Sequence, residues 1–239
     1  IYISGWGNIL GSNYQGLPGN DGNSNADEYN RTEARSIAAL VSGTVDGNVD
    51  YGVPLLAIRY LYPNMVATTV PEFQAFRRYW ETLPNDVWGT DGPDGVPAIR
   101  VSPMSDSWAN FYCWRFDRYF ARSRENGVYQ DFAHPILDMN PLHGAGYERN
   151  GKRYPTYCLF RHREINKRLY RIAKKYETPE RPIFFIGHSG GTYILPHGNF
   201  WQMTNDGEYF GAVTNERKPY SDFFTPERIR AEFDGRQFG

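Results

Sequence analysis

The chain alternates repeatedly between short β-like apolar runs and stretches with helical periodicity. The β-like runs are residues 2–6, 53–61, 98–101, 127–131, 183–187 and 200–204. This alternation is typical of βα units and not of separate α and β regions. Six such strands predict an α/β fold of the (β/α)8 TIM-barrel type, incomplete, with about six βα units. A doubly wound open sheet is the structural alternative, because the pattern alone does not separate the two folds.

Start signals predict the helices that follow these strands. We expect helices over residues 27–41, from Pro71 onward, and over 105–124, 159–176 and 225–233. Proline is favoured in the first turn of a helix, which supports the start at Pro71. In that helix we expect Phe73, Phe76 and Tyr79 to face inward.

The length of 239 residues is ordinary for one α/β barrel, so we interpret residues 1–239 as a single domain. The sequence begins without Met inside a β-like run and ends just after a helical pattern. We therefore expect the barrel to be truncated at both ends.

Charge and hydropathy exclude several classes of partner. The 26 basic and 27 acidic side chains give a net charge of −1 without a concentrated basic stretch, so no nucleic acid is expected. No run approaches the ~18 apolar residues of a membrane span, and no membrane is expected either. Cys113 and Cys158 lack metal-site spacing, and the sequence leaves open whether they pair.

No cofactor or metal is predicted. His134, Asp138 and His143 follow the run 127–131, and three such ligands could hold zinc. They lack regular helical spacing, which favours a hydrogen-bonding loop or sugar-binding side chains instead.

Two carboxylates follow strands in the manner of catalytic groups. Asp131 ends the run 127–131, and Glu208 lies just past the run 200–204. In a parallel barrel the working residues lie at the C-terminal ends of the strands. Glycosidic cleavage needs one carboxyl group to protonate the leaving oxygen and another to attack the anomeric carbon or activate water. We therefore predict a glycoside hydrolase whose catalytic pair is Asp131 and Glu208.

The expected roles of the two carboxylates differ. Asp131 would be the nucleophile or charge stabiliser, kept ionised by backbone donors and a cation such as Arg59 or Arg100. Glu208 would be the general acid, in an apolar setting to which Trp201 could contribute.

Aromatic residues make up 16% of the chain and suit a carbohydrate substrate, because the C–H faces of sugars stack on rings. The predicted substrate-binding residues are aromatic or polar side chains near strand ends or in the following loops. They are Trp6, Arg59, Tyr60, Arg100, Asp138, His143, Tyr147, His188, Trp201 and Asp206. One of them, Asp206, is also an alternative to Glu208 as the general acid.

Two alternatives remain open. The first is a non-catalytic carbohydrate-binding barrel, which would share the aromatic residues but not the carboxylate chemistry. The second is a serine hydrolase, because residues 187–191 fit the G-x-S-x-G pattern around Ser189. That mechanism needs a later His, and the only one is His197, eight residues on. We therefore predict that Ser189 is not a nucleophile.

Five motifs together resemble a bacterial family of glycoside-hydrolase-like barrel proteins, largely uncharacterised. They are LYPN at 61–64, GVYQD at 127–131, NPLHGAGY at 140–147, DGE at 206–208 and RAEFDGRQFG at 230–239. The resemblance covers nearly the whole chain. It implies flanking β-rich domains, further barrel strands after residue 239, and a periplasmic or extracellular location.

The hydrophobic-Tyr-x-Asp sequence that ends at Asp131 also looks like the nucleophile strand of the α-galactosidase clan. The acid/base of that clan follows the sixth strand, which maps onto Glu208. The family is similar in outline to β-N-acetylgalactosaminidases that use an adjacent Asp-Glu pair. This chain departs from their pattern, since Phe132 follows Asp131.

Overall fold

The structure is a computed structural model. It describes residues 2–4, 35–46, 49–50, 52–68, 70–84, 87–88, 98–121, 123–131, 133–188 and 198–205, and, near the end, 222, 225–227 and 230.

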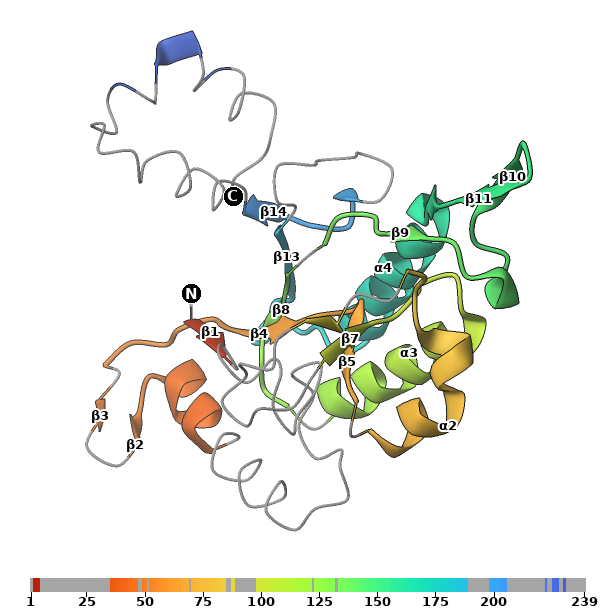
Figure 1. The fold of residues 1–239 in the computed structure, drawn as a ribbon. Helices are drawn as coiled ribbons and strands as arrows, with labels where there is room; N and C mark the ends of the chain where they lie inside the picture. The colour runs from red at the N-terminus through yellow and green to blue at the C-terminus, as the bar shows by residue number, and fades with distance from the viewer. Residues whose placement is uncertain are drawn as a thin grey trace.

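The chain has a mixed α/β fold with a five-stranded parallel sheet (Figure 1). The strands are β1 (Tyr2–Ser4), β4 (Ala57–Leu61), β8 (Gly127–Gln130), β13 (Phe184–His188) and β14 (Met203–Asn205), and they lie side by side in this order. All four neighbouring pairs are parallel. Spatial order thus follows chain order, unlike the reversed order of a doubly wound sheet. The described strands do not close into a barrel.

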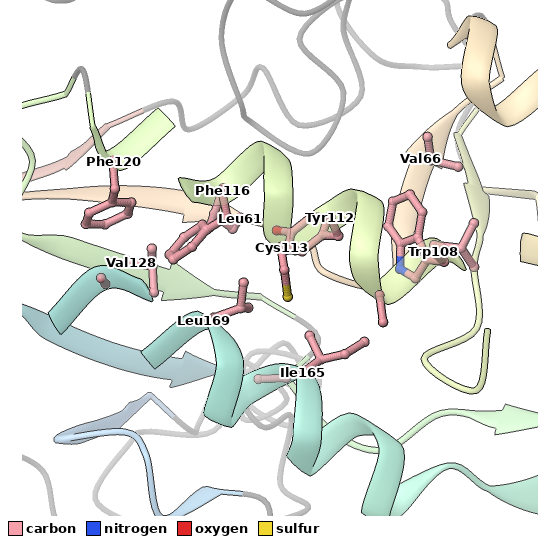
Figure 2. Packing of buried hydrophobic residues seen from close by; sticks show 14 of the residues in the cluster. Leu61, Val66, Trp108, Tyr112, Cys113, Phe116, Phe120, Val128, Ile165 and Leu169 are labelled. Carbon is pink, nitrogen blue, oxygen red and sulfur yellow. The ribbon is translucent and has the colours of Figure 1, made fainter. Parts of the chain in front are cut away.

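The helices pack on one face of this sheet. Leu61, Val128 and Phe185 share a buried cluster with apolar residues of α2 (Pro71–Trp80), α3 (Asp106–Phe120) and α4 (Leu159–Lys174). Figure 2 shows side chains of α3 and α4 meeting in this core. The helical residues 35–42 pack against Ala57, on the same face of β4 as Leu61. Each large apolar side chain buried here stabilises the fold by about 1.5–3 kcal/mol relative to exposure.

The opposite face of the sheet carries a second, aromatic cluster. Ile58 and Tyr60 of β4, Tyr129 of β8 and Ile186 of β13 belong to it. These positions alternate with Arg59, Leu61, Val128 and Phe185, as the period of two in a β-strand requires. Both faces are buried, which explains why the strands read as nearly continuous apolar runs.

The run 98–101 does form a strand, but the prediction that it belongs to the parallel sheet is wrong. The strand β7 (Ala98–Arg100) pairs antiparallel with β5 (Met65–Ala67) and β6 (Val87–Trp88) in a separate three-stranded sheet. This sheet lies in the long connection between β4 and β8, so those two strands are direct neighbours. The described parallel sheet accordingly has five strands and not six.

Smaller elements complete the fold. A short ladder joins β2 (Val45–Asp46) to β3 (Val49–Asp50). The connection between β8 and α4 contains β9 (Leu137–Asp138), the 3-10 turn Pro141–His143, and the hairpin of β10 (Tyr147–Arg149) and β11 (Lys152–Tyr154). The strand β12 (Thr156–Tyr157) pairs back onto β9 before α4 begins. None of the helices in the described part of the chain is both long and apolar enough to cross a bilayer.

The helix predictions are partly right. Helix α2 begins at Pro71, and Ser105 caps α3 by accepting a hydrogen bond from the Trp108 amide. The predicted inner face of α2 is wrong for Phe76 and Tyr79, which are exposed. Trp80 is buried instead, beside Phe73. The start of the predicted helix over residues 27–41 and most of the predicted helix over residues 225–233 lie outside the described residues.

Gly127 permits the close pairing of β8 and β13. Its φ is +150°, and a Cβ at this position would lie 1.8 Å from the carbonyl oxygen of Phe184. Only glycine permits so close an approach, so Gly127 determines how closely β8 and β13 pair at their first residues.

Candidate functional site

Asp131 directly follows β8, the central strand of the parallel sheet. Its backbone N–H donates to the Leu61 carbonyl, which extends the ladder with β4. Because Val128 and Gln130 face the helices, the side chain of Asp131 lies with Tyr129 on the face away from them. The carboxylate is therefore at the carboxyl end of the sheet, on the face away from these helices, and Asp131 is only 7% exposed.

Two side chains from the neighbouring strands contact this carboxylate. The hydroxyl of Tyr60, on β4, donates a hydrogen bond to Oδ2 of Asp131. The imidazole Nδ1 of His188, at the end of β13, lies 2.6 Å from Oδ1. Burial first, and the Asp131 carboxylate second, raise the pKa of Tyr60 far above its usual value. Tyr60 is consequently a neutral hydroxyl donor throughout the physiological pH range.

Aromatic rings surround the cluster of Tyr60, Asp131 and His188. The Tyr60 ring stacks on Tyr129 at 5.2 Å between centroids and tilts against Tyr62 at 5.8 Å. Tyr129 also lies 6.0 Å from the His188 ring. The rings limit the positions that Tyr60 and His188 can adopt, so the polar groups on Asp131 are held by packing.

A buried hydrogen-bond chain lies behind the cluster, on the helix side of the sheet. The Trp201 indole N–H donates to Oε1 of Gln130 at 2.5 Å, and the Gln130 amide donates to Oδ1 of Asn166 at 3.2 Å. These two hydrogen bonds connect the end of β8 to α4 and to the segment before β14. Trp201 therefore packs in the core on the helix side of the sheet, and its predicted sugar-binding role stays a prediction.

Arg59 also lies on the helix side, contrary to the expectation that it stands beside Asp131. It is fully buried, 3.8 Å from Glu125 and over the ring of Tyr119 on α3. Its neighbours Ile58 and Tyr60 face the other way, so strand geometry turns Arg59 from the carboxylate. The Tyr60 hydroxyl and His188 contact Asp131, whereas Arg59 lies beside Glu125 on the other face.

Arg100 belongs to β7 in the antiparallel sheet, and its predicted role as a cation near Asp131 stays a prediction. Its carbonyl accepts a hydrogen bond from the Thr82 amide. Ala98 of the same strand and Met65, the register partner of Arg100, pack in the cluster that contains Tyr60 and Tyr129.

Asp138 and His143 form a buried pair in the connection after β8. One carboxylate oxygen of Asp138 accepts from the amides of Leu83 and Asn140, and the other lies 3.2 Å from His143 Nδ1. Burial lowers the pKa of His143, although Asp138 acts in the opposite direction. Asp138 has no exposed surface and holds the loop together through these contacts, and its predicted role in sugar binding stays a prediction.

No group of three or more His, Cys, Asp or Glu side chains in the described region is arranged to hold a metal ion, the trio of His134, Asp138 and His143 included. Cys113 and Cys158 are buried free thiols and do not pair.

Tyr147 lies on the hairpin β10–β11, which projects from the body of the molecule (Figure 1). It is half exposed and stacks on Tyr154 across the hairpin at 5.5 Å. Of the remaining predicted residues, Trp6, Ser189, Asp206 and Glu208 lie outside the described residues. The structure thus brings together Asp131, Tyr60 and His188, and the roles predicted for them stay predictions.

Sequence reasoning missed Tyr129 and Tyr62, which pack around the cluster. A signal for both was present, because Tyr129 precedes Asp131 by two residues and Tyr62 follows Tyr60 by two. Residues two apart on a strand share a face.

Comparisons with known proteins bring out distant structural neighbours. No protein-family model and no curated protein sequence matches the chain. Among solved structures, the α-galactosidase TtGalA from Thermus thermophilus, in complex with stachyose, is 13% identical with a TM-score of 0.40, over 63% of this chain and 28% of that one. The GH36 α-galactosidase AgaA from Geobacillus stearothermophilus is 13% identical with a TM-score of 0.44, over 69% and 21%.

A third neighbour is the noncanonic maltogenic α-amylase AmyB from Thermotoga neapolitana. It is 11% identical with a TM-score of 0.44, over 77% of this chain and 36% of that one. All three neighbours are glycoside hydrolases, and the chain spans between about a fifth and just over a third of their length.

Proposed function

We propose that this chain is the barrel part of a glycoside hydrolase, with Asp131 and Glu208 as its carboxylate pair. The observation that carries the proposal is the position of Asp131 at the carboxyl end of the central parallel strand, on the face away from the helices. In parallel α/β barrels that face is the interior, and catalytic groups end its strands. Sequential strand order and helices on one face support the barrel.

The chemistry requires an ionised carboxylate at Asp131, acting as nucleophile or charge stabiliser. A hydroxyl and an imidazole contact its two oxygens, and both can serve as donors to an anion. The aromatic rings of Tyr60, Tyr62 and Tyr129 add apolar walls, which suit the C–H faces of a carbohydrate. Glu208 is the proposed general acid, and Asp206 remains its rival on sequence grounds.

The two proposed roles are tested by different substitutions in the full-length protein. Asp131→Asn removes the charge that attacks or stabilises the anomeric carbon, so turnover of every aryl glycoside should be lost. Glu208→Gln removes the proton donor, which substrates with good leaving groups do not need. That variant should keep activity on dinitrophenyl glycosides and regain turnover with azide.

Other outcomes distinguish the alternatives. Full activity in both variants would refute the carboxylate pair. A wild-type protein that binds oligosaccharides but hydrolyses none of a broad aryl-glycoside panel would instead support the non-catalytic carbohydrate-binding barrel. Asp206→Asn, measured beside Glu208→Gln, identifies which of these carboxyl groups supplies the proton.

A further inference from the structure

We propose that Tyr60 and His188 are positioning residues that hold Asp131 in one orientation as a hydrogen-bonded anion, and that they do not bind substrate through those donor atoms. The inference rests on the proposed function, because Asp131 is there the working carboxylate. It changes the role predicted for both residues, which the sequence suggested as sugar ligands.

The strand order places the two donors on opposite sides of Asp131. β8 lies between β4 and β13, and Tyr129 is in register with Tyr60 on one side and with Ile186 on the other. Asp131 and His188 each lie two residues farther along their strands, on the same face. Tyr60 therefore reaches Oδ2 from one strand while His188 reaches Oδ1 from the other.

The chemistry of the contacts fixes the direction of each hydrogen bond. An ionised carboxylate has only acceptor sites, so a contact at 2.6 Å requires the proton to be on Nδ1 of His188. Tyr60 is a neutral phenol, for the reasons of burial and charge given above, and donates its hydroxyl proton. One donor is thus assigned to each oxygen of Asp131.

Burial makes these donors hard to replace. Asp131, His188 and Tyr60 are 7%, 8% and 3% exposed, so little water reaches the carboxylate in their place. Hydrogen bonds to an ion are stronger than those between neutral groups. Loss of either donor should leave Asp131 less ordered and less readily ionised, which slows the chemical step more than it weakens substrate binding.

A pair of isosteric substitutions at His188 separates this role from bulk packing. The side-chain amide of Asn places its N–H₂ near the position of Nδ1, whereas that of Gln places it near Nε2. We expect His188→Asn to keep kcat within about threefold, and His188→Gln to lower kcat by about 10- to 100-fold with little change in KM. Tyr60→Phe should lower kcat by a similar factor.

The matched control is Tyr112→Phe, the same chemical change in a tyrosine buried in the core on the helix side of the sheet. It should leave kcat and KM unchanged. The inference is overturned if His188→Gln and Tyr60→Phe raise KM with kcat intact, since that is the behaviour of substrate ligands. It is also overturned if His188→Asn and His188→Gln are equally impaired.

A spectroscopic readout tests the hydrogen bond without any turnover. In the full-length protein labelled with ¹⁵N-histidine, the His188 signal is assigned by its loss in His188→Asn. We expect the Nδ1–H form with a downfield proton in the wild type, and its loss in Asp131→Ala. An inert enzyme with this signal would defeat the proposed function but keep the inference. An active enzyme whose His188 carries only an Nε2 proton would defeat the inference alone.

Discussion

The imidazole of His188 lies across two paired parallel strands from the carboxylate of Asp131, with Nδ1 2.6 Å from Oδ1. The residues are 57 positions apart in sequence and meet because β8 and β13 pair in one particular register. A shift by one residue would turn His188 toward the helices and remove the contact. The geometry of the candidate site is thus a direct product of strand register, which Gly127 helps to set through its close approach to Phe184.

Tyr112→Phe should leave the protein as stable as the wild type or stabilise it by up to about 1 kcal/mol. The Tyr112 hydroxyl is buried and makes no hydrogen bond with the described residues, so its removal relieves a desolvation cost. The measurement is the free energy of unfolding in urea. Tyr176→Phe is the contrast, because that hydroxyl donates to Asp117 at 2.7 Å, and its loss should destabilise the fold slightly. A Tyr112→Phe variant destabilised by more than about 1 kcal/mol would contradict this account.

Both cysteines should resist thiol reagents in the folded protein. Burial raises the pKa of Cys113 to about 11 and that of Cys158 to about 12, so near pH 8 each thiol is almost entirely protonated and shielded. Ellman's reagent should react slowly with native protein and quickly with both thiols after denaturation. Rapid labelling of the native protein would contradict the burial of the thiols. The absence of free thiol after unfolding without reductant would show that the two cysteines form a disulfide.

Arg59→Met should destabilise the fold by about 3 kcal/mol without raising KM in the protein that remains folded. The substitution removes the buried cation that lies 3.8 Å from Glu125, and Arg59 faces away from Asp131. Arg77→Met is the matched control, since its ion pair with Glu81 is exposed and should be worth about 0.5 kcal/mol or less. Chemical unfolding and steady-state kinetics measure the two effects. A higher KM in the folded Arg59→Met variant would instead indicate that Arg59 binds substrate.

Ser189 should not react with a fluorophosphonate probe, because the G-x-S-x-G mechanism needs a His later in the chain and the sequence offers only His197, eight residues on. Mass spectrometry of the treated full-length protein would detect any adduct. Ser189→Ala should keep whatever glycoside turnover the wild type has. An adduct on Ser189 that abolishes activity would favour a serine hydrolase.

The sequence predicts the strands and helices best where local sequence signals mark their ends. The runs 127–131 and 183–187 correspond to β8 and β13 within one residue, and Pro71 marks the start of α2. These features are local, since apolar runs and helix starts depend on neighbouring residues. From the sequence we could infer only that Asp131 and His188 both lie at strand ends, and not that their side chains are in contact.

The failures concern partners that are distant in sequence. The run 98–101 has the composition of a barrel strand, but its partners are residues 65–67 and 87–88, and no local pattern reveals an antiparallel register with them. Arg59 lies in a strand buried on both faces, so alternation does not say which face is the interior. The position of Arg59 beside Glu125 shows that its side chain lies on the helix side of the sheet, and no local sequence pattern predicts that pairing.

The most direct test of the central claim is kcat/KM for aryl glycosides in Asp131→Asn, measured beside wild type and Asp106→Asn. The control makes the same change at an exposed aspartate at the start of α3, which pairs with Arg161 at the surface. If Asp131 carries the chemistry, its variant should lose turnover on the order of 10³-fold or more while staying folded, and Asp106→Asn should match the wild type. Wild-type kcat/KM in folded Asp131→Asn would contradict the account.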